Sequence, residues 1–274
     1  MNKLGCSVLL PVYAKDNESY LRLALQSLVI QTSKAGEVVL VIDGPIPESL
    51  NSLVREFEEV LPLNPVFLKE NVGLGAALNQ GLARARYPLV MRMDADDICH
   101  ERRIEEQVGF FELHPEVDIL GSYAVEVSSS GVERGERRVP STHAEIINAL
   151  WTCPLIHPTV MYRKDKILSI GGYDPSLRRR QDYELWFRCA KSGLVFENLK
   201  APLLFYRFDS SSHKKQPVRL AFEQGVIGYK GSRYMGLSLW KALACFAPLL
   251  RSLLPGRLQH TAYRLMKHMD PRQT

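Results

Sequence analysis

The chain has 274 residues, of which 46% are hydrophobic and 24% charged, so it can bury a large core as one domain or as one domain with an appendage. Its five cysteines are odd in number and contain no CxxC pair, which argues against a disulfide framework or a zinc site and favours a reducing cytoplasm. The net charge of +5 is uneven, because residues 1–206 carry 23 Lys and Arg against 27 Asp and Glu, whereas residues 207–274 carry 12 against 3.

The chain opens with an apolar run, LGCSVLLPVYA (4–14), which follows Lys3 and places Leu4-Gly5-Cys6 in lipoprotein order. No apolar segment precedes Cys6, and Pro11 interrupts the run that follows, so the pattern does not fit a secretion signal. We therefore expect a first core strand here.

Short β-rich runs alternate with helical patterns along the first half of the chain. Apolar residues recur three or four positions apart in the helical segments. This βαβ repetition predicts an α/β fold with a mostly parallel, Rossmann-like central sheet flanked by helices, in which ligands bind beyond the carboxyl ends of the strands. The predicted strands are 6–13, 38–43, 65–70 and 87–94, and the predicted helices are 20–31, 48–61 and 73–86.

The strand ends bring polar and turn-forming residues to one edge of the predicted sheet. Asp43, before Gly-Pro, could bind a ligand or simply form a turn. The turn 72–75 opens a helix, so its amides could receive a phosphate, or its glycines could only start the helix. The residues expected at this edge are Pro11, Val12 and Tyr13, then Asp43, then Glu70 and Asn71, and finally Asp94, Asp96 and Asp97.

Three carboxylates, Asp94, Asp96 and Asp97, crowd into four positions where the fourth strand ends. Asp96 or Asp97 could cap a helix predicted over 101–113, because an acidic first turn is favourable to the helix dipole. A cap needs only one Asp, however, and three repel one another unless a positive charge lies between them. Mg²⁺ or Mn²⁺ binds such carboxylates and completes its shell with water and phosphate oxygens. The crowding therefore predicts a site for a metal-bound diphosphate.

The second half contains two further strand patterns and a helix. HPTVMYR (157–163) reads as a strand and PLLFYRF (202–208) as another. A helix is predicted to end near Gly193. The residues expected on its buried face are Leu185, Trp186 and Cys189.

The last segment, residues 237–269, is apolar with basic residues spaced through it. Its longest uncharged core, Ala242 to Leu250, is far shorter than the ~20 residues that cross a bilayer as a helix. A basic amphipathic segment with a Trp suits an anionic membrane surface, and a helical pair covering the main domain explains the pattern equally well. We expect no nucleic acid partner, because the basic residues alternate with aliphatic rather than aromatic side chains.

Several motifs, in their order and spacing, resemble glycosyltransferase family 2. CSVLLPVY (6–13), VLVIDGP (39–45), ENVGLGAALNQGL (70–82) and MDADD (93–97) are similar to its nucleotide-binding half. HPTVMYRK (157–164) and GGYDPSLRRRQDYELWFRCAKSG (171–193) resemble its acceptor region, closest to bacterial exopolysaccharide enzymes of the amylovoran and colanic-acid type. The resemblance covers roughly residues 5–210. It implies a GT-A fold with a nucleotide-sugar-binding half (1–120), an acceptor-binding half (121–210) and a basic amphipathic helical tail (211–274).

The resemblance implies a role for each matching residue. Asp182 falls at the general base, which accepts the proton of the acceptor hydroxyl as that oxygen attacks the anomeric carbon and inverts it. Glu184 is the second choice for this role, and a simple place at the start of a helix is the alternative for Asp182. The donor-site positions are occupied by Pro11, Tyr13, Asp43 and Asn71 for the nucleotide, Asp94 for the ribose, Asp96 for Mn²⁺ or Mg²⁺, and Asp97 in support of the metal.

The chain departs from the family pattern at two places. Gln181 stands where relatives usually have Glu, and Ile42-Asp43-Gly44 stands where many have Asp-Asp-Gly. Neither change removes a group with a fixed chemical role. The run Arg178–Arg180 is most simply a solvated face, although beside Asp182 it could contact phosphate, as in a lipid-diphosphate acceptor. The residues that could contact acceptor or diphosphate are His157, Arg180, Gln181 and His213.

The resemblance therefore implies a metal-dependent inverting glycosyltransferase of the hexosyltransferase type. We expect it to use a nucleoside-diphosphate sugar, in the first instance a UDP-sugar. The expected acceptor is a lipid-linked saccharide for surface polysaccharide, bound at the cytoplasmic face of the membrane, with the enzyme cytoplasmic and peripheral.

Two rival functions remain open from the sequence. A non-catalytic nucleotide-sugar-binding subunit would bind the donor without turnover. A sugar-nucleotide pyrophosphorylase would need a glycine-rich signature with Arg and Lys near the first strand, which LLPVYAKDNES (9–19) lacks.

Overall fold

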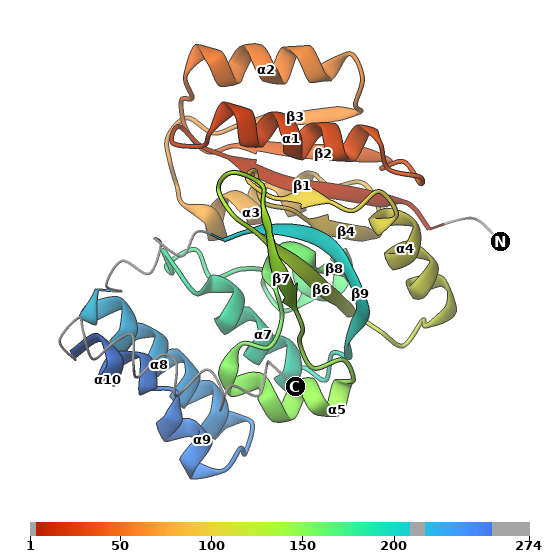
Figure 1. Cartoon of the computed structure of the whole chain (residues 1–274). Coiled ribbons are helices and arrows are strands. Elements are labelled where there is room, and N and C mark those ends of the chain that lie inside the picture. Colours follow the sequence, from red (N-terminus) through yellow and green to blue (C-terminus); the bar gives the residue numbers. More distant parts are fainter. Residues whose placement is uncertain (1–3, 209–216, 254–274) are drawn as a thin grey trace.

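The computed structural model describes residues 4–208 and 217–253, which contain a continuous central sheet flanked by helices (Figure 1). The elements of the first half are β1 (Cys6–Val12), α1 (Glu18–Val29), β2 (Glu37–Ile42), α2 (Glu48–Glu58), β3 (Leu63–Phe67), α3 (Leu74–Arg84) and β4 (Leu89–Arg92). The strands lie in the order β3, β2, β1, β4 and are all parallel. The predicted βαβ repetition is therefore confirmed.

The second half extends the same sheet with strands of mixed direction. Its elements are β5 (Ile98–Cys99), α4 (Arg103–Leu113), β6 (Ile119–Val127), β7 (Glu133–Arg137), α5 (His143–Ala149), β8 (Met161–Arg163), α6 (Lys164–Ser169), α7 (Gln181–Lys191) and β9 (Phe196–Arg207). β8 is antiparallel to both β4 and β6, β6 is parallel to β9 and antiparallel to β7, and β9 is antiparallel to β5. The prediction of a mostly parallel sheet thus holds for the first half only.

Burial accounts for the arrangement of the first half. All six residues of β2, EVVLVI, are buried, as expected for a strand covered on both faces. The core residues of α1, α2 and α4 form one hydrophobic cluster with the sheet, and those of α3 and α7 form another. Gly81 allows α3 to approach β1 closely, because a Cβ at this position would lie 2.2 Å from Leu9 Cδ1.

One predicted strand is wrong at its start, whereas the predicted helix is confirmed. Residues His157–Thr159 form a 3₁₀ turn, and β8 begins only at Met161. Pro158 has no N–H for a strand ladder and fits the first turn of a helix, which explains the difference. The helix predicted to end near Gly193 is α7, and the three residues expected on its inner face, Leu185, Trp186 and Cys189, are buried.

Three helices follow the sheet: α8 (Val218–Tyr234), α9 (Leu239–Ala244) and α10 (Ala247–Leu253). α8 packs tightly on α7, since a Cβ at Gly231 would lie 2.3 Å from the Phe187 ring. α9 buries Ala242, whereas α10 buries none of its residues. Part of the predicted tail therefore packs on the domain. No helix within the described ranges is long and apolar enough to cross a membrane.

Candidate active site

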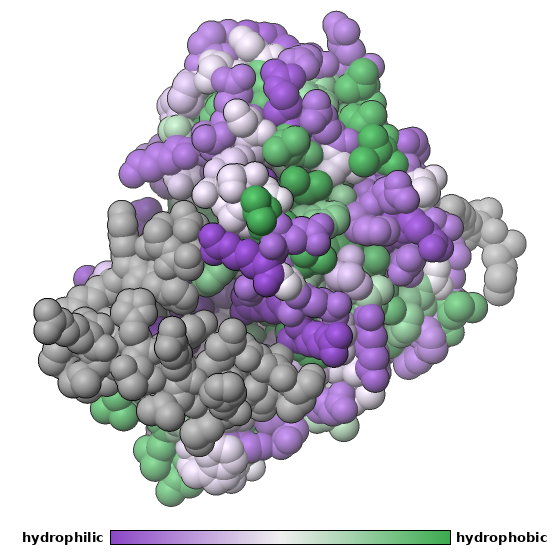
Figure 2. All heavy atoms as spheres, in the orientation of Figure 1, coloured by the Kyte–Doolittle hydropathy of each residue, from purple (hydrophilic) through white to green (hydrophobic). Residues whose placement is uncertain are grey.

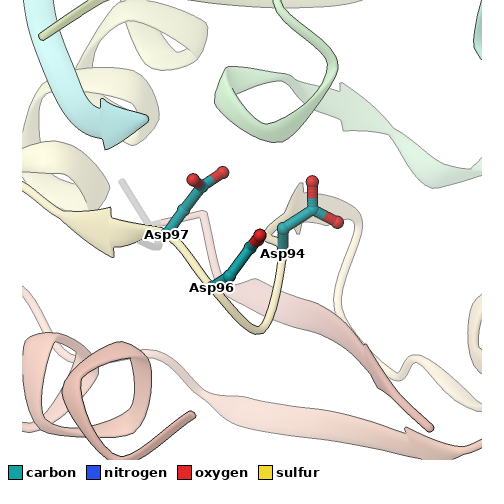
Figure 3. A group of neighbouring side chains, drawn as sticks. All are labelled: Asp94, Asp96 and Asp97. Atoms are coloured by element: carbon teal, nitrogen blue, oxygen red, sulfur yellow. The ribbon is translucent and has the colours of Figure 1, made fainter. Parts of the chain in front are cut away.

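The acidic cluster (Asp94, Asp96 and Asp97) lies in the turn between β4 and β5, at the carboxyl edge of the parallel strands. Figure 3 shows the three side chains projecting to the same side of this turn. Each offers a carboxylate oxygen, and these oxygens all lie within 4.8 Å of one another. The crowding that the sequence indicated is therefore real in space.

Helix capping, the alternative explanation of these carboxylates, is wrong. β5 separates Asp97 from α4, which starts only at Arg103. Its N-cap residue is Arg102, and no side chain makes a capping hydrogen bond there. The aspartates hence have no part in starting that helix.

Two arginines that the sequence analysis did not single out hold the acidic cluster in place. Arg92, only 2% exposed, forms an ion pair with Asp94. Arg207, at the end of β9, donates from its amide to Asp97 Oδ1 at 2.8 Å and from its Nε to the Asp96 carbonyl at 2.9 Å. Arg207, from the second half of the sheet, thus supplies a positive charge and two hydrogen bonds to the turn that carries the acidic cluster.

A fourth carboxylate, Asp16, lies near the acidic cluster and was missed from the sequence. It sits in the loop after β1, where Asp16 Oδ2 accepts a hydrogen bond from the Tyr13 amide at 2.8 Å. Burial, and then the charges of Asp96 and Asp94, raise its pKa to about 7. Its position just beyond a strand end was the signal that could have found it.

The acidic cluster carries more negative charge than its arginines compensate. Asp96 is exposed, but desolvation by the surrounding protein, followed by the charge of Asp94, raises its pKa to about 6. Burial and the charges of both neighbours raise the pKa of Asp97 well above its usual range. Asp97 Oδ2 is buried and has no hydrogen-bond partner among the described residues. Hard carboxylate oxygens with an unpaired buried acceptor fit a divalent cation such as Mg²⁺ or Mn²⁺.

Asp43 and Asn71 meet at the ends of β2 and β3, as predicted for residues that share this edge. The Asp43 carboxylate accepts hydrogen bonds from Asn71 Nδ2 at 3.0 Å, the Val72 amide at 2.7 Å and the Gly73 amide at 3.1 Å. Two amides of the turn 72–75 are therefore engaged by protein, which removes them as the phosphate site that the glycines suggested. Asp43 organises the turn and is itself only 5% exposed.

Asp182 and Glu184 stand in the first turn of α7 in different situations. Glu184 forms a two-bonded pair with Arg188, whose Nε and Nη2 each donate to it at 2.7 Å. Half-buried Asp182 makes no ion pair with a described residue, and its one hydrogen-bond contact is the Cys153 thiol, with Sγ 4.0 Å from Oδ2. Of the two carboxylates, Asp182 is the one that no cation engages within the described residues.

The remaining predicted residues fall in different places. His157 lies beneath the site, buried, with Nε2 2.9 Å from the Tyr173 hydroxyl. Burial, and then the charge of Arg92, lower the pKa of His157 well below its usual range. Gln181 is buried at the start of α7, Arg180 is exposed just before it, and His213 lies outside the described residues. Pro11 is half-buried on β1, and Tyr13 is exposed beyond it.

Comparisons with known proteins agree with this architecture. A family model described as glycosyl transferase family 2 matches residues 7–186. The amylovoran biosynthesis glycosyltransferase AmsE of Erwinia amylovora is 40% identical over 211 residues, which cover 77% of this chain and 79% of that protein. A UDP-Gal:alpha-D-GlcNAc-diphosphoundecaprenol beta-1,3-galactosyltransferase of Escherichia coli is 33% identical over 211 residues, 77% of this chain and 76% of that protein.

A solved structure matches the fold of the chain. S. aureus TarS 1–349, crystallised in complex with UDP-GlcNAc, aligns with a TM-score of 0.68 over 91% of this chain and 72% of that one. The two sequences are 20% identical. This likeness confirms the predicted GT-A fold.

Proposed function

Because this chain belongs to glycosyl transferase family 2 and is a glycosyltransferase, we propose that it is a metal-dependent inverting enzyme. Its donor is a nucleoside-diphosphate sugar, a UDP-sugar in the first instance, and its acceptor is a hydroxyl of a lipid-linked saccharide in surface polysaccharide synthesis. The observation that carries the proposal is the acidic cluster, with its unpaired buried Asp97 oxygen, at the sheet edge that also holds Asp43 and Asn71.

The chain's own residues divide the work of donor binding. Pro11, Tyr13, Asp43 and Asn71 hold the nucleotide, with Asp43 fixing the turn 72–75 beside it. Asp94, oriented by Arg92, contacts the ribose. Asp96 would hold Mn²⁺ or Mg²⁺ with Asp97 in support, and the bound ion would offset the negative charge of the diphosphate.

Asp182 is the general base in this proposal. Its carboxylate accepts the proton of the acceptor hydroxyl while that oxygen forms a bond to the anomeric carbon, and the bond from this carbon to the nucleoside diphosphate breaks. A single displacement inverts the anomeric centre. The absence of an ion pair at Asp182 within the described residues supports this role, and the pairing of Glu184 with Arg188 speaks against the second choice.

Similar proteins support the proposed substrates. The TarS structure holds UDP-GlcNAc, the E. coli relative is named for UDP-Gal and a diphosphoundecaprenol-linked sugar, and AmsE is named for amylovoran biosynthesis. From these names we propose the same substrate classes for this chain, with a UDP-sugar as the donor and a lipid-linked saccharide as the acceptor.

The C-terminal helices support a peripheral place on the cytoplasmic face of the membrane. Figure 2 shows hydrophobic side chains gathered at the lower left edge of the molecule, in the region of α9. The large exposed side chains of α9 and α10 are Leu239, Trp240, Leu243, Leu250 and Leu253. Since residues 207–274 carry 12 Lys and Arg against 3 Asp and Glu, this surface suits anionic lipid. Flotation with anionic vesicles tests it, and unchanged association after deletion of residues 237–274 would refute the membrane clause.

Thermal unfolding with nucleotides tests the donor site. A ligand that binds only the folded state at 100 times its Kd stabilises it by about 2.7 kcal/mol. We expect a rise in Tm with UDP and Mn²⁺ together that is lost in Asp96→Ala but kept in Asp165→Ala, a matched exposed aspartate on α6. If neither UDP nor GDP, with or without Mn²⁺, raised the Tm of the unaltered protein, the proposed donor site would be refuted.

A further inference from the structure

Three consecutive arginines, Arg178 to Arg180, form an exposed loop immediately before α7 (the arginine loop). None of their side chains forms an ion pair or hydrogen bond with a residue in the described ranges, although the Arg180 carbonyl accepts from the Glu184 amide at 3.1 Å. The loop reaches the nucleotide edge of the molecule, because a Cβ at Gly73 would lie 3.9 Å from Arg178 Cδ. The arginine loop of the second half therefore lies beside the turn that Asp43 organises in the first half.

The charge of Arg179 also acts on the nucleotide edge, through its effect on Tyr13. Burial, and then the carboxylates of Asp16 and Asp96, raise the pKa of Tyr13, whereas the Arg179 guanidinium lowers it. Tyr13 thus lies within electrostatic range of both the acidic residues and the arginine loop. A group bound beside Tyr13 would therefore be near the negative charge of the acidic residues and the positive charge of the arginine loop.

Specific contacts fix the segment that carries the arginine loop against α3. Asn79 Nδ2 donates to the Tyr173 carbonyl at 2.7 Å, and the Tyr173 amide donates back to Asn79 Oδ1 at 2.8 Å. A Cβ at Gly75 would lie 3.1 Å from the Asp174 carbonyl and 3.6 Å from Gln181 Cβ. The two ends of the segment are therefore held against the start of α3, which keeps the arginines at the nucleotide edge.

The position of these arginines does not serve the stability of α7. Cations are unfavourable near the N-terminus of a helix, where the dipole is positive and anions are preferred. Arg180 nevertheless occupies the N-cap of α7, makes no side-chain cap and has a left-handed backbone with φ of 64°. A non-glycine residue in this conformation is strained, as is common at ligand sites.

We propose that Arg178 and Arg179 bind a diphosphate group at the edge formed by Gly73 and Tyr13, across from the acidic cluster. The inference rests on the proposed function and deepens it by naming the cationic side of the diphosphate site. A guanidinium presents paired N–H donors that match phosphate oxygens, and it keeps its charge at all relevant pH values. The diphosphate is that of the nucleotide donor or that of a lipid-diphosphate acceptor, which share this chemistry.

The test compares Arg178→Gln/Arg179→Gln with Arg84→Gln, a matched exposed arginine at the far end of α3. Isothermal titration in Mn²⁺ measures the affinity of each protein for UDP, uridine, inorganic pyrophosphate and farnesyl diphosphate. We expect the double variant to fold with an unchanged or higher Tm, because it loses cations at a helix N-terminus.

The ligands distinguish the two sources of the diphosphate. A loss of about tenfold or more in UDP affinity, with uridine unchanged, assigns the arginine loop to the donor. The same loss for farnesyl diphosphate, with UDP unchanged, assigns it to the acceptor. Affinities for every phosphate ligand equal to those of Arg84→Gln would overturn the inference. Failure of the unaltered protein to bind UDP would instead count against the proposed function, and pyrophosphate would then still report on the arginines.

Discussion

The two aspartates proposed for donor and acceptor chemistry, Asp43 and Asp182, lie in contrasting surroundings. Asp43 ends β2 in the parallel half of the sheet, nearly fully buried, with its carboxylate accepting three hydrogen bonds. Asp182 begins α7 in the mixed half, and among the described residues it contacts only a thiol. A carboxylate held by three donors shapes the protein around it, whereas one with few partners is available to contact a bound substrate. We therefore expect their substitutions to affect different quantities.

The largest effect should come from Asp182→Asn. If Asp182 takes the proton of the acceptor hydroxyl, the amide of Asn removes this base without changing the shape of the side chain. We therefore expect kcat to fall by about 10²- to 10⁴-fold. The free energy of unfolding and the affinity for UDP should stay unchanged, since Asp182 forms no ion pair in the described structure. Transfer from a UDP-sugar, with chemical denaturation alongside, measures both quantities.

Glu184→Gln provides the matched control on the same helical turn. This change breaks the pair with Arg188, which also donates to the carbonyls of Ile170 and Gly172, so it should cost stability and leave kcat nearly unaltered. If Asp182→Asn kept full activity, Asp182 would not be the base, and the distinction drawn between the two aspartates would fail. Activity lost in Glu184→Gln but kept in Asp182→Asn would move the role to Glu184.

Asp43→Asn should affect stability and donor binding rather than the proton transfer step. The amide offers one acceptor where the carboxylate has two, so one of the Val72 and Gly73 amides would face an N–H instead of an oxygen. An unsatisfied buried donor costs about 1–3 kcal/mol in the free energy of unfolding. Urea denaturation measures this loss, which should exceed that of Asp182→Asn. Equal stability of the two variants would show that the hydrogen bonds of Asp43 do not organise the turn.

The contrast between the halves also explains what the sequence could reveal. Strands and helices of the first half were predicted within a few residues, because a parallel sheet covered on both faces requires continuous apolar runs such as EVVLVI in β2. β7, with the sequence ERGER and every residue outside the core, carries no such pattern and was missed. The short β5 is likewise defined by its pairing with β9 rather than by its own two residues.

The candidate site shows the same division. The rule that parallel strands end at one edge of a sheet predicted two features of the site. These are the clustering of Asp94, Asp96 and Asp97 and the meeting of Asp43 with Asn71. The contribution of Arg207 depends on the pairing of β9 with β5 next to the turn after β4, a long-range pairing that local patterns do not record. The pair of Glu184 with Arg188, by contrast, is an i,i+4 pair that the helical spacing could have predicted.

The last expected effect concerns pH and a carboxylate of the first half. The pKa of Asp16 is raised from 3.8 to about 7, chiefly by burial and then by the charges of Asp96 and Asp94. A group whose pKa is raised by folding favours the folded state at low pH, and that contribution is lost as the pH rises from about 4 to about 7. Asp16→Asn cannot ionise and can still accept the hydrogen bond from the Tyr13 amide. In metal-free buffer the variant should therefore match the unaltered protein in Tm near pH 4 and exceed it at pH 8. If the Tm gap of Asp16→Asn did not widen with pH, the carboxylates at this edge of the first half would not repel one another as their positions indicate.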